Sequence, residues 1–479
     1  MDFDVALIGA TLLTGDPHRP ALADGVLGIR GDRIAAIGSR ETFPPRIEAG
    51  TLLDLHGRVV TPGFVNVHTH AVLSLMRGIA LDMGFAPAYT PGVPHGHDIS
   101  EDEAVALARL GALEALTFGS TTMVDSYVHA HVTLPAMAEL GLRVWSCTRF
   151  HDVDFTRVHE GVWRHDERIG DECIAATRRL IAEHHGGAGG RTNVMVAPHA
   201  PDTCSEHLLV KAAALARETE TRLWTHLSQS PLENRVIRER GGCTPTELLE
   251  RCGLLDERLL AAHCIYVTDD DIARISASGM TVAHVPKGNA TGGAMAPTPK
   301  FKAAGARIAI GTDNLTQDMT EAMRWALAIA RIQVGSVSPD WQPATALHMA
   351  TQAGARALGM DSRLGALAPG YLADLVVFDF RRAHLTPLLD PLGTLVHDAS
   401  GRDVEHVFVD GVHVIASGEP TMADAARIRA DAQRVSESLW SRARGERGAG
   451  GGHARGSQPY SAAAAPSAFH TPRAKLRGT

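Results

Sequence analysis

The sequence predicts an α/β protein in which a (β/α)8 barrel is inserted into a small β-sandwich formed by the N- and C-terminal segments. Short apolar runs alternate with helical patterns eight times between residues 62 and 365, and strand-rich segments lie on both sides of this region. Regular alternation of strand and helix favours a parallel sheet closed into a barrel. We expect a composite sandwich over 1–61 and 366–430, a barrel over 62–365, and a disordered, basic, low-complexity tail over 442–479.

Eight short apolar segments are the expected barrel strands. They are GFVNVHTH, TTMVDSYVH, LRVWSCTRF, NVMVAPH, RLWTHLS, LLAAHCIY, MTVAHVP and ARIAIGTD. Among the helical segments between them, Ser100 with Glu103 and Thr244 with Glu247 have the spacing of capping boxes. At the two ends of the chain, segments such as DVALIGATLLTG and VEHVFVDGVHVIASG are apolar runs bounded by Gly and Asp, which is typical of strands.

Composition excludes several classes of protein. The 479 residues are 44% hydrophobic and 21% charged, as in globular proteins, and the six cysteines form no Cys-x-x-Cys pair. The net charge is −8 although the segment from Arg442 onward is basic, so the acidic body argues against a nucleic-acid partner. That basic segment is interpreted as a solvated end or, alternatively, as a contact for an anionic surface. No signal-peptide pattern or membrane-spanning apolar run is visible, and we expect a cytoplasmic protein.

Histidines are placed at the ends of the predicted strands. His68 and His70 end the first strand, and their spacing of two puts both side chains on the same side of it. Later strand ends carry His199, His226, His263, His284 and finally Asp313. The carboxyl ends of barrel strands converge on one mouth, so these side chains predict a divalent metal site there.

Three or four N/O ligands that leave a position open are typical of a catalytic metal site. A metal in such a site lowers the pKa of bound water from about 15.7 to about 7. Asp313 can serve both as a ligand and as a general base, while His263 can hydrogen-bond the water or a developing oxyanion. The pattern therefore predicts attack of hydroxide on an electrophilic carbon. Phosphoryl transfer and serine hydrolysis are disfavoured, because the sequence has no Gly-rich phosphate loop and no Ser nucleophile elbow.

The motifs PGFVNVHTH, VAPHAPDTCS, WTHL, AAHC, IGTD and LGALAPGYLADLVVFD resemble the amidohydrolase superfamily. The similarity covers residues 3 to 420 and points to the chlorohydrolase, cytosine deaminase and S-adenosylhomocysteine deaminase branch. It implies one metal, zinc or alternatively ferrous iron, and a homo-oligomeric enzyme. The implied ligands are His68, His70, His226 and Asp313, with His263 assisting the water and His199 contacting the substrate. NVMVAPHAP contains no lysine, where dinuclear relatives carry a carboxylated one, and this supports a single metal.

One position departs from the branch. Relatives read His-x-x-Glu after the fifth strand, and that Glu shuttles a proton, whereas here His226 is followed by Gln229 and later by Glu233. A glutamine can hydrogen-bond but cannot release a proton at neutral pH. Three interpretations stay open: another group such as Asp313 carries the proton, the leaving group needs none, or the protein binds metal without turnover.

The expected function is metal-dependent deamination of an amino-substituted nitrogen heterocycle, such as a purine, pterin, pyrimidine or triazine. The first alternative is hydrolytic dechlorination or dealkylamination of a triazine-like ring. The second is a non-catalytic metal-binding homologue, because Gln229 replaces the usual acid. In each case the partner is a small heterocyclic molecule.

Substrate contacts are less sharply defined by the sequence. Asn314, with Gln317, is expected near the pocket mouth, where its amide contacts a polar heterocycle or, alternatively, caps the next helix. Arg149 would bind an anionic substrate group or pair with a neighbouring acid. Cys204 is interpreted as a buried inert thiol rather than a reactive one. The Pro- and Gly-rich segment from Met83 to Asp98 is an active-site lid or a surface insertion.

Overall fold

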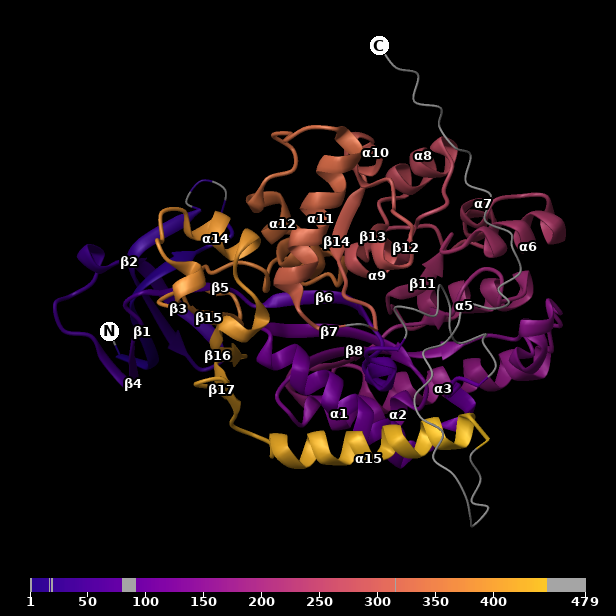
Figure 1. Cartoon of the computed structure of the whole chain (residues 1–479), viewed down its shortest axis with the longest axis horizontal. Coiled ribbons are helices and arrows are strands. Elements are labelled where there is room, and N and C mark those ends of the chain that lie inside the picture. The colour runs from indigo at the N-terminus through magenta and orange to yellow at the C-terminus, as the bar shows by residue number, and fades with distance from the viewer. Residues whose placement is uncertain (1, 17, 19, 80–91, 315, 446–479) are drawn as a thin grey trace, which may run out of the picture.

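The computed structural model of the chain describes residues 2–445, apart from 17, 19, 80–91 and 315 (Figure 1). Its centre consists of two curled parallel sheets, in which every predicted strand segment is found. The first sheet holds β6 (Phe64–Thr69), β7 (Ser120–Tyr127), β8 (Arg143–Phe150), β9 (Thr192–Val194) and β10 (Ala197–Pro198). The second holds β11 (Leu223–Leu227), β12 (Leu259–His263), β13 (Thr281–His284) and β14 (Arg307–Ile310).

Backbone hydrogen bonds join the two sheets at both edges. On one side the Trp224 N–H donates to the Val196 carbonyl at 3.0 Å. On the other side the N–H groups of Thr312 and Asp313 donate to the His68 carbonyl at 3.1 and 2.8 Å. The first and last strands of the region, β6 and β14, are therefore neighbours, and the strand ends predicted to carry the site lie together.

Helices lie between successive strands and around the sheets (Figure 1). The capping boxes at Ser100 with Glu103 and at Thr244 with Glu247 are confirmed. α2 contains Pro135, and the residues of α6 are mostly exposed or half-buried. The helices of this region are α1 (Glu101–Thr117), α2 (Ala130–Ala138), α3 (Glu167–His184), α4 (Gly187–Gly190), α5 (Glu206–Glu218), α6 (Pro231–Gly241), α7 (Pro245–Arg251), α8 (Asp269–Ser278), α9 (Pro286–Thr291), α10 (Thr298–Ala303), α11 (Met319–Val334), α12 (Pro343–Ala350) and α13 (Gln352–Ala357).

The two ends of the chain share one nine-stranded sheet. Its strands are β1 (Asp2–Leu13), β2 (Ala21–Arg30), β3 (Arg33–Ser39), β4 (Glu48–Asp54), β5 (Arg58–Pro62), β15 (Leu375–Asp379), β16 (Val404–Val409), β17 (Val412–Ala416) and β18 (Glu419–Pro420), with α14 (Pro391–His397) between β15 and β16. β15 runs antiparallel to β5, which links the ends. The buried Arg143 of β8 pairs with Asp374 and Asp410, so an ionic cluster attaches this sheet to the central region.

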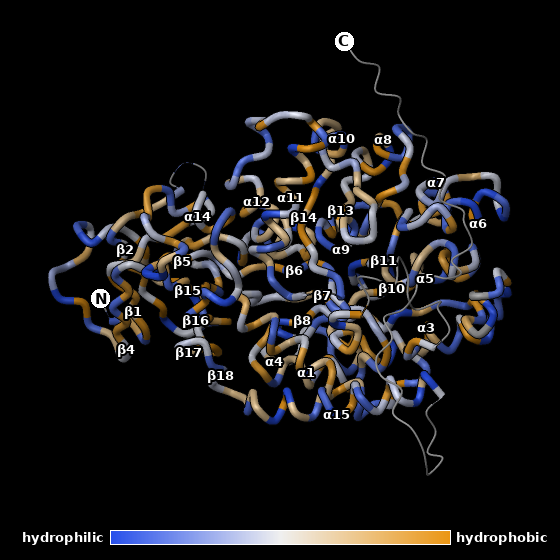
Figure 2. Tube along the Cα trace, in the orientation of Figure 1, coloured by the Kyte–Doolittle hydropathy of each residue, from blue (hydrophilic) through white to orange (hydrophobic). Residues whose placement is uncertain are grey.

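A C-terminal helix that the sequence analysis did not anticipate, α15 (Ala425–Ala443), packs along α1 (Figure 1). It crosses both the predicted end of the sandwich at 430 and the predicted start of the tail at 442. Arg442, in its last turn, pairs with Glu103 at 2.8 Å. Polar and apolar residues alternate along α15 in Figure 2, and the buried ones are Ala425, Ile428, Ala432, Val435 and Leu439.

The predicted disordered tail lies, from residue 446 onward, outside the described residues. Within the described part of the chain, every helix is too short or too polar to cross a membrane.

Candidate metal centre

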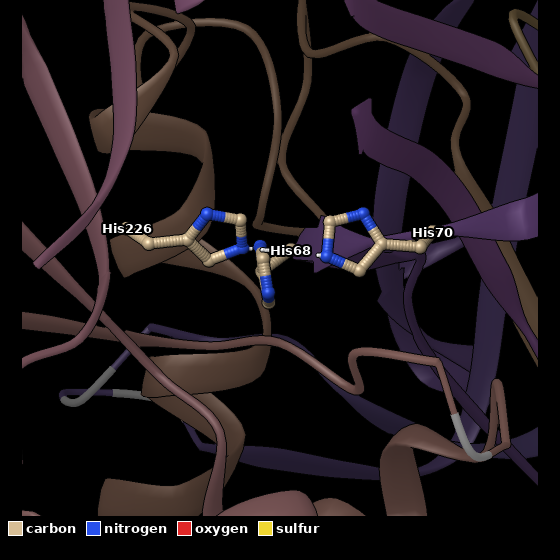
Figure 3. Close-up of side chains that lie close together, drawn as sticks. All are labelled: His68, His70 and His226. Atoms are coloured by element: carbon tan, nitrogen blue, oxygen red, sulfur yellow. Dashed lines mark hydrogen bonds between the residues drawn. The ribbon is translucent and has the colours of Figure 1, made fainter. Parts of the chain in front are cut away.

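Five predicted side chains gather at the carboxyl ends of the parallel strands. The imidazoles of His68, His70 and His226 have ligand nitrogens that all lie within 4.8 Å of one another. His68, His263 and Asp313 form a second group that meets the same limit. Figure 3 shows the rings of His70 and His226 pointing toward each other, with His68 between them. The arrangement brings four imidazoles and one carboxylate to a single place.

The proton positions on two rings follow from their neighbours. The Nδ1 atoms of His70 and His226 are bonded to the carbonyls of Ser126 and His199, the latter at 2.7 Å. A carbonyl only accepts, so both Nδ1 atoms carry the proton and both Nε2 atoms carry a lone pair. Burial lowers the pKa of both imidazoles, which keeps the rings neutral.

The two Nε2 atoms lie 3.4 Å apart. Two lone pairs facing each other at this distance repel, unless an electrophile lies between them. Two nitrogen ligands held tetrahedrally at about 2.0–2.1 Å from zinc are themselves about 3.4 Å apart. The spacing of His70 and His226 therefore fits a cation bound by both.

His68 supplies a second test of that fit. It is fully buried, and among the described residues neither of its ring nitrogens has a hydrogen-bond partner. Its ring stacks on Trp224, with centroids 5.3 Å apart. Burial and then the neighbouring histidines hold its pKa well below the usual range. An unsatisfied buried polar group costs roughly 1–3 kcal/mol, and a coordinated metal ion would remove that cost.

Asp313 faces the histidines across gaps longer than a hydrogen bond. Its Oδ1 atom lies 3.8 Å from Nε2 of His68 and 3.7 Å from Nε2 of His70. Its Oδ2 atom lies 3.9 Å from Nε2 of His263. Asp313 has a φ of +63° and His263 a φ of +75°, a left-handed conformation that residues other than glycine seldom adopt. Such backbone conformations cluster at functional sites, where the surrounding structure enforces them.

Asn289 orients His263. The Nδ1 atom of His263 lies 2.9 Å from the side-chain oxygen of Asn289, and both residues are buried. Because that oxygen accepts, Nδ1 carries the proton and the Nε2 lone pair faces Asp313. Burial lowers the pKa of His263. Asn289, five residues after His284 in the chain, was not among the predicted site residues.

The predicted substrate contacts His199 and Arg149 lie beside the cluster. His199 is buried, its ring is 4.9 Å from that of His226, and its Nδ1 atom is 2.9 Å from the Thr203 hydroxyl. The Arg149 guanidinium lies over the rings of Tyr127 and Phe155, at 5.5 and 5.1 Å. No ion pair among the described residues includes Arg149, so the alternative of pairing with a neighbouring acid is not supported.

Gln229 lies in a turn held by Glu233. The backbone N–H groups of Ser228 and Gln229 donate to the buried Glu233 carboxylate at 2.8 and 2.7 Å. The Ser230 hydroxyl caps α6 by accepting from the Glu233 N–H. Burial, with a contribution from Asp202, raises the pKa of Glu233 to about 8. Glu233 thus supports the loop on which Gln229 is mounted.

The structure bears on the alternative interpretations of Asn314 and Cys204. Asp318 caps α11 by accepting from the N–H groups of Thr320 and Glu321, so the prediction that Asn314 caps this helix is wrong. Cys204 is fully buried and burial raises its thiol pKa strongly, which favours the inert interpretation. Asn314 itself is half-buried.

Two further predictions concern a histidine and a loop. His284 is fully buried, its ring nitrogens have no hydrogen-bond partner among the described residues, and burial lowers its pKa to about 3. It belongs to neither of the two groups of potential ligands. The predicted loop from Met83 to Asp98 lies, as far as residue 91, outside the described residues.

Parallel strands that gather four imidazoles and a carboxylate at their carboxyl ends define an α/β protein suited to holding a divalent cation. Residues 59–414 match the amidohydrolase family. The chain belongs to that family and is an enzyme of the hydrolase class, as its motifs predicted.

Curated relatives carry related names. The chain is 34% identical to a 5-methylthioadenosine/S-adenosylhomocysteine deaminase of Moorella thermoacetica, over 86% of this chain and 94% of that protein. It is 32% identical to a 5'-deoxyadenosine deaminase of Methanosarcina barkeri, over 92% of this chain and 99% of that protein.

Solved structures show the same fold. An adenosine deaminase of Xanthomonas campestris with bound zinc has a TM-score of 0.82 and 24% identity, covering 91% of this chain and 99% of that chain. An atrazine chlorohydrolase of Arthrobacter aurescens TC1 complexed with zinc has a TM-score of 0.80 and 23% identity, covering 90% of this chain and 100% of that chain.

Proposed function

We propose that this amidohydrolase is a metal-dependent deaminase of an adenine nucleoside. The observation that carries the proposal is that the Nε2 atoms of His70 and His226 lie 3.4 Å apart. Beside them lies the ring of His68, whose nitrogens have no hydrogen-bond partner among the described residues. The deaminase names of relatives that align over most of the chain support an aminopurine as the heterocycle.

His68, His70, His226 and Asp313 would hold one divalent ion, with zinc as the first choice and ferrous iron as the alternative. Neutral imidazoles and a carboxylate are ligands that suit both metals. When bound, the ion supplies Lewis acidity that lowers the pKa of a water from about 15.7 to about 7.

The protein side chains would manage the protons. Asp313 takes the proton of the attacking water and returns it to the departing amine, since its carboxylate is the acid group that faces the histidines. His263 presents its Nε2 atom to the same carboxylate and orients the water. His199 contacts the purine ring, with its Nδ1 atom held by the Thr203 hydroxyl.

Gln229 and Asn314 would hydrogen-bond the heterocycle through their amides. Arg149 is not paired with an acid among the described residues, and its charge would attract an anionic group at the far end of a longer substrate. Together these residues favour a polar purine with a substituent that reaches toward Tyr127 and Phe155.

A second candidate function is hydrolytic dechlorination or dealkylamination of a triazine-like ring. Gln229 favours it, because a chloride leaves without a proton and the usual acid is missing. A protein that binds metal without turnover is the remaining alternative.

We also propose that the two curled sheets form one (β/α)8 barrel and that the nine-stranded sheet forms a composite sandwich domain. The hydrogen bonds at both sheet edges support the barrel. A homo-oligomeric cytoplasmic enzyme with neither nucleic-acid nor membrane partner completes the proposal.

A substrate panel tests the proposed function. Ammonia is measured with the zinc-loaded protein on adenosine, 5'-deoxyadenosine, 5-methylthioadenosine, S-adenosylhomocysteine, a pterin, an aminopyrimidine and an aminotriazine, and chloride is measured on chlorinated analogues. We expect ammonia from the adenine nucleosides. Chloride without ammonia would favour the second candidate, and neither product would contradict both.

A further inference from the structure

Three buried polar side chains next to Asp313 are joined by hydrogen bonds into a cluster. Asn66 lies on β6, two residues before His68. Thr312 and Gln317 lie in the segment that connects β14 to α11. The exposed fractions of Asn66, Thr312 and Gln317 are 0, 4 and 4%, respectively. None of the three was predicted as a site residue, apart from the expectation that Gln317 lies near the pocket mouth.

Four hydrogen bonds join the three residues. The Asn66 side-chain amide donates to the Thr312 hydroxyl at 2.7 Å and to Gln317 Oε1 at 3.2 Å. The Thr312 hydroxyl donates to the same Gln317 oxygen at 3.2 Å. The Asn66 side-chain oxygen accepts from the Thr312 N–H at 3.1 Å. The Gln317 Oε1 atom is therefore committed to the cluster.

The backbone on either side of Thr312 is also fixed to β6. The Asp313 N–H donates to the His68 carbonyl at 2.8 Å. A Cβ atom added at Gly311 would lie 2.5 Å from the His68 Cβ, so no side chain fits between these strands. Residues 311–313 are thus held against the strand that carries His68 and His70.

Asp313 needs such support because of its backbone conformation. Its φ of +63° is unfavourable for a residue with a side chain, and it persists only where the surroundings enforce it. That conformation directs the Asp313 carboxylate toward the Nε2 atoms of His68, His70 and His263. The hydrogen bonds of Thr312 hold the residue immediately before it.

We propose that Asn66, Thr312 and Gln317 are positioning residues that hold Asp313 in its left-handed conformation, so that its carboxylate meets the histidine cluster. The inference rests on the proposed function for its effect on turnover, but its effect on metal binding is independent of any substrate. Groups that orient metal ligands typically change metal affinity or activity about 10- to 100-fold when they are mutated.

Removal of the Thr312 hydroxyl is the most direct test. Thr312→Val keeps the shape of the side chain and loses both of its hydrogen bonds, whereas Thr312→Ser keeps the hydroxyl. The control Thr177→Val removes an equally buried threonine hydroxyl, which bonds the Cys173 carbonyl in α3, away from the cluster. Zinc affinity, the visible spectrum of the cobalt-substituted protein, kcat and KM are measured for each.

We expect Thr312→Val to weaken zinc binding and lower kcat by about 10-fold or more, with little change in KM and an altered cobalt spectrum. Thr312→Ser and Thr177→Val should resemble the wild type. Unchanged zinc affinity and an unchanged cobalt spectrum in Thr312→Val would overturn the inference, as would an equal loss in Thr177→Val.

A second variant covers the case in which Thr312→Val does not fold. Gln317→Met preserves side-chain length but removes the shared acceptor oxygen, and we expect a weaker change in the same direction. Wild-type levels of zinc binding and kcat in Gln317→Met would then overturn the inference. If the wild type deaminates none of the nucleosides but Thr312→Val loses zinc affinity, the proposed function fails and the positioning role stands.

Discussion

The Nε2 atoms of His70 and His226 face each other at 3.4 Å, although both rings already use their Nδ1 hydrogen to bond a backbone carbonyl. Two neutral imidazoles fixed in this way present converging lone pairs. The backbone carbonyls of Ser126 and His199 therefore hold both rings in the orientation that the proposed metal binding requires.

Removal of bound metal should destabilise the protein as well as inactivate it, because the lone pairs of His70 and His226 would lose the cation between them. A ligand at 100 times its Kd stabilises the folded state by about 2.7 kcal/mol. We expect the Tm measured by calorimetry to fall after chelation and to recover, together with activity, on addition of zinc. A Tm that is indifferent to zinc would contradict the assignment of this cluster.

Asp313→Ala should abolish turnover, since the variant lacks both a proposed metal ligand and the proposed proton carrier. kcat is compared with that of the wild type, with Asp340→Asn as a control at an exposed carboxylate. A variant that keeps more than about a tenth of the wild-type rate would remove Asp313 from the role of general base, whose contribution is typically about 10²–10⁴-fold.

Gln229→Glu should raise the rate of deamination, because it restores a proton donor on the loop after β11. A well-placed general acid contributes up to about 10²–10⁴-fold, so an increase of about 10-fold is a modest expectation. kcat is measured as a function of pH, and the titration of the new carboxyl group should add a further pH-dependent change in kcat. An unchanged or lower rate would contradict this expectation and would leave Asp313 as the sufficient carrier of the proton.

Arg149→Met should weaken binding of substrates that carry a carboxylate and spare those that do not. Hydrogen bonds to charged groups contribute about 1.5–3 kcal/mol, which corresponds to roughly 10- to 100-fold in KM. KM is compared for S-adenosylhomocysteine and 5-methylthioadenosine. An equal change for both substrates would show that Arg149 acts on the pocket and not on the carboxylate.

Stability should fall as pH rises because of Glu233. Burial raises the pKa of this carboxyl group to about 8, whereas in the unfolded chain it titrates near 4.5. Between these values the folded state binds the additional proton, so stability decreases from about pH 4.5 to about pH 8 and changes no further above that. Asp202, with a pKa raised to about 6 by burial, adds to the same trend at lower pH.

Glu233→Gln tests this dependence. The variant leaves one backbone N–H of the turn without a good acceptor, so its Tm should be lower at every pH, but the slope of Tm against pH should be flatter. Glu239→Gln, at an exposed position of the same helix, is the control for slope. An identical slope in Glu233→Gln and the wild type would contradict the raised pKa.

The grouping of the histidines with Asp313 could be predicted from the sequence, because each of these residues lies at the end of a short apolar run that is recognisable as a strand. His68 and His70 are two residues apart, and each later ligand candidate ends a short apolar run. The same period of two placed Asn66 beside them, and this was the available signal for its role. Its partner Thr312 is 246 residues away in the chain, so that contact required the fold.

Other features depend on geometry that residue types do not reveal. The left-handed backbone at His263 and Asp313 occurs at residues that seldom adopt it. Asp318 rather than Asn314 caps α11, because the helix begins at Met319 and Asp318 is the residue immediately before it. α15 was missed although its buried residues recur every three or four positions, so the helical signal was present in the sequence.

A zinc titration tests the central claim most directly. Metal-free protein receives increasing zinc, and the rate of ammonia release from 5-methylthioadenosine is measured at each addition. The proposal predicts a rate that rises in proportion to zinc and reaches a plateau at one zinc per chain. No ammonia at any zinc level, with activity absent on the other adenine nucleosides as well, would contradict it.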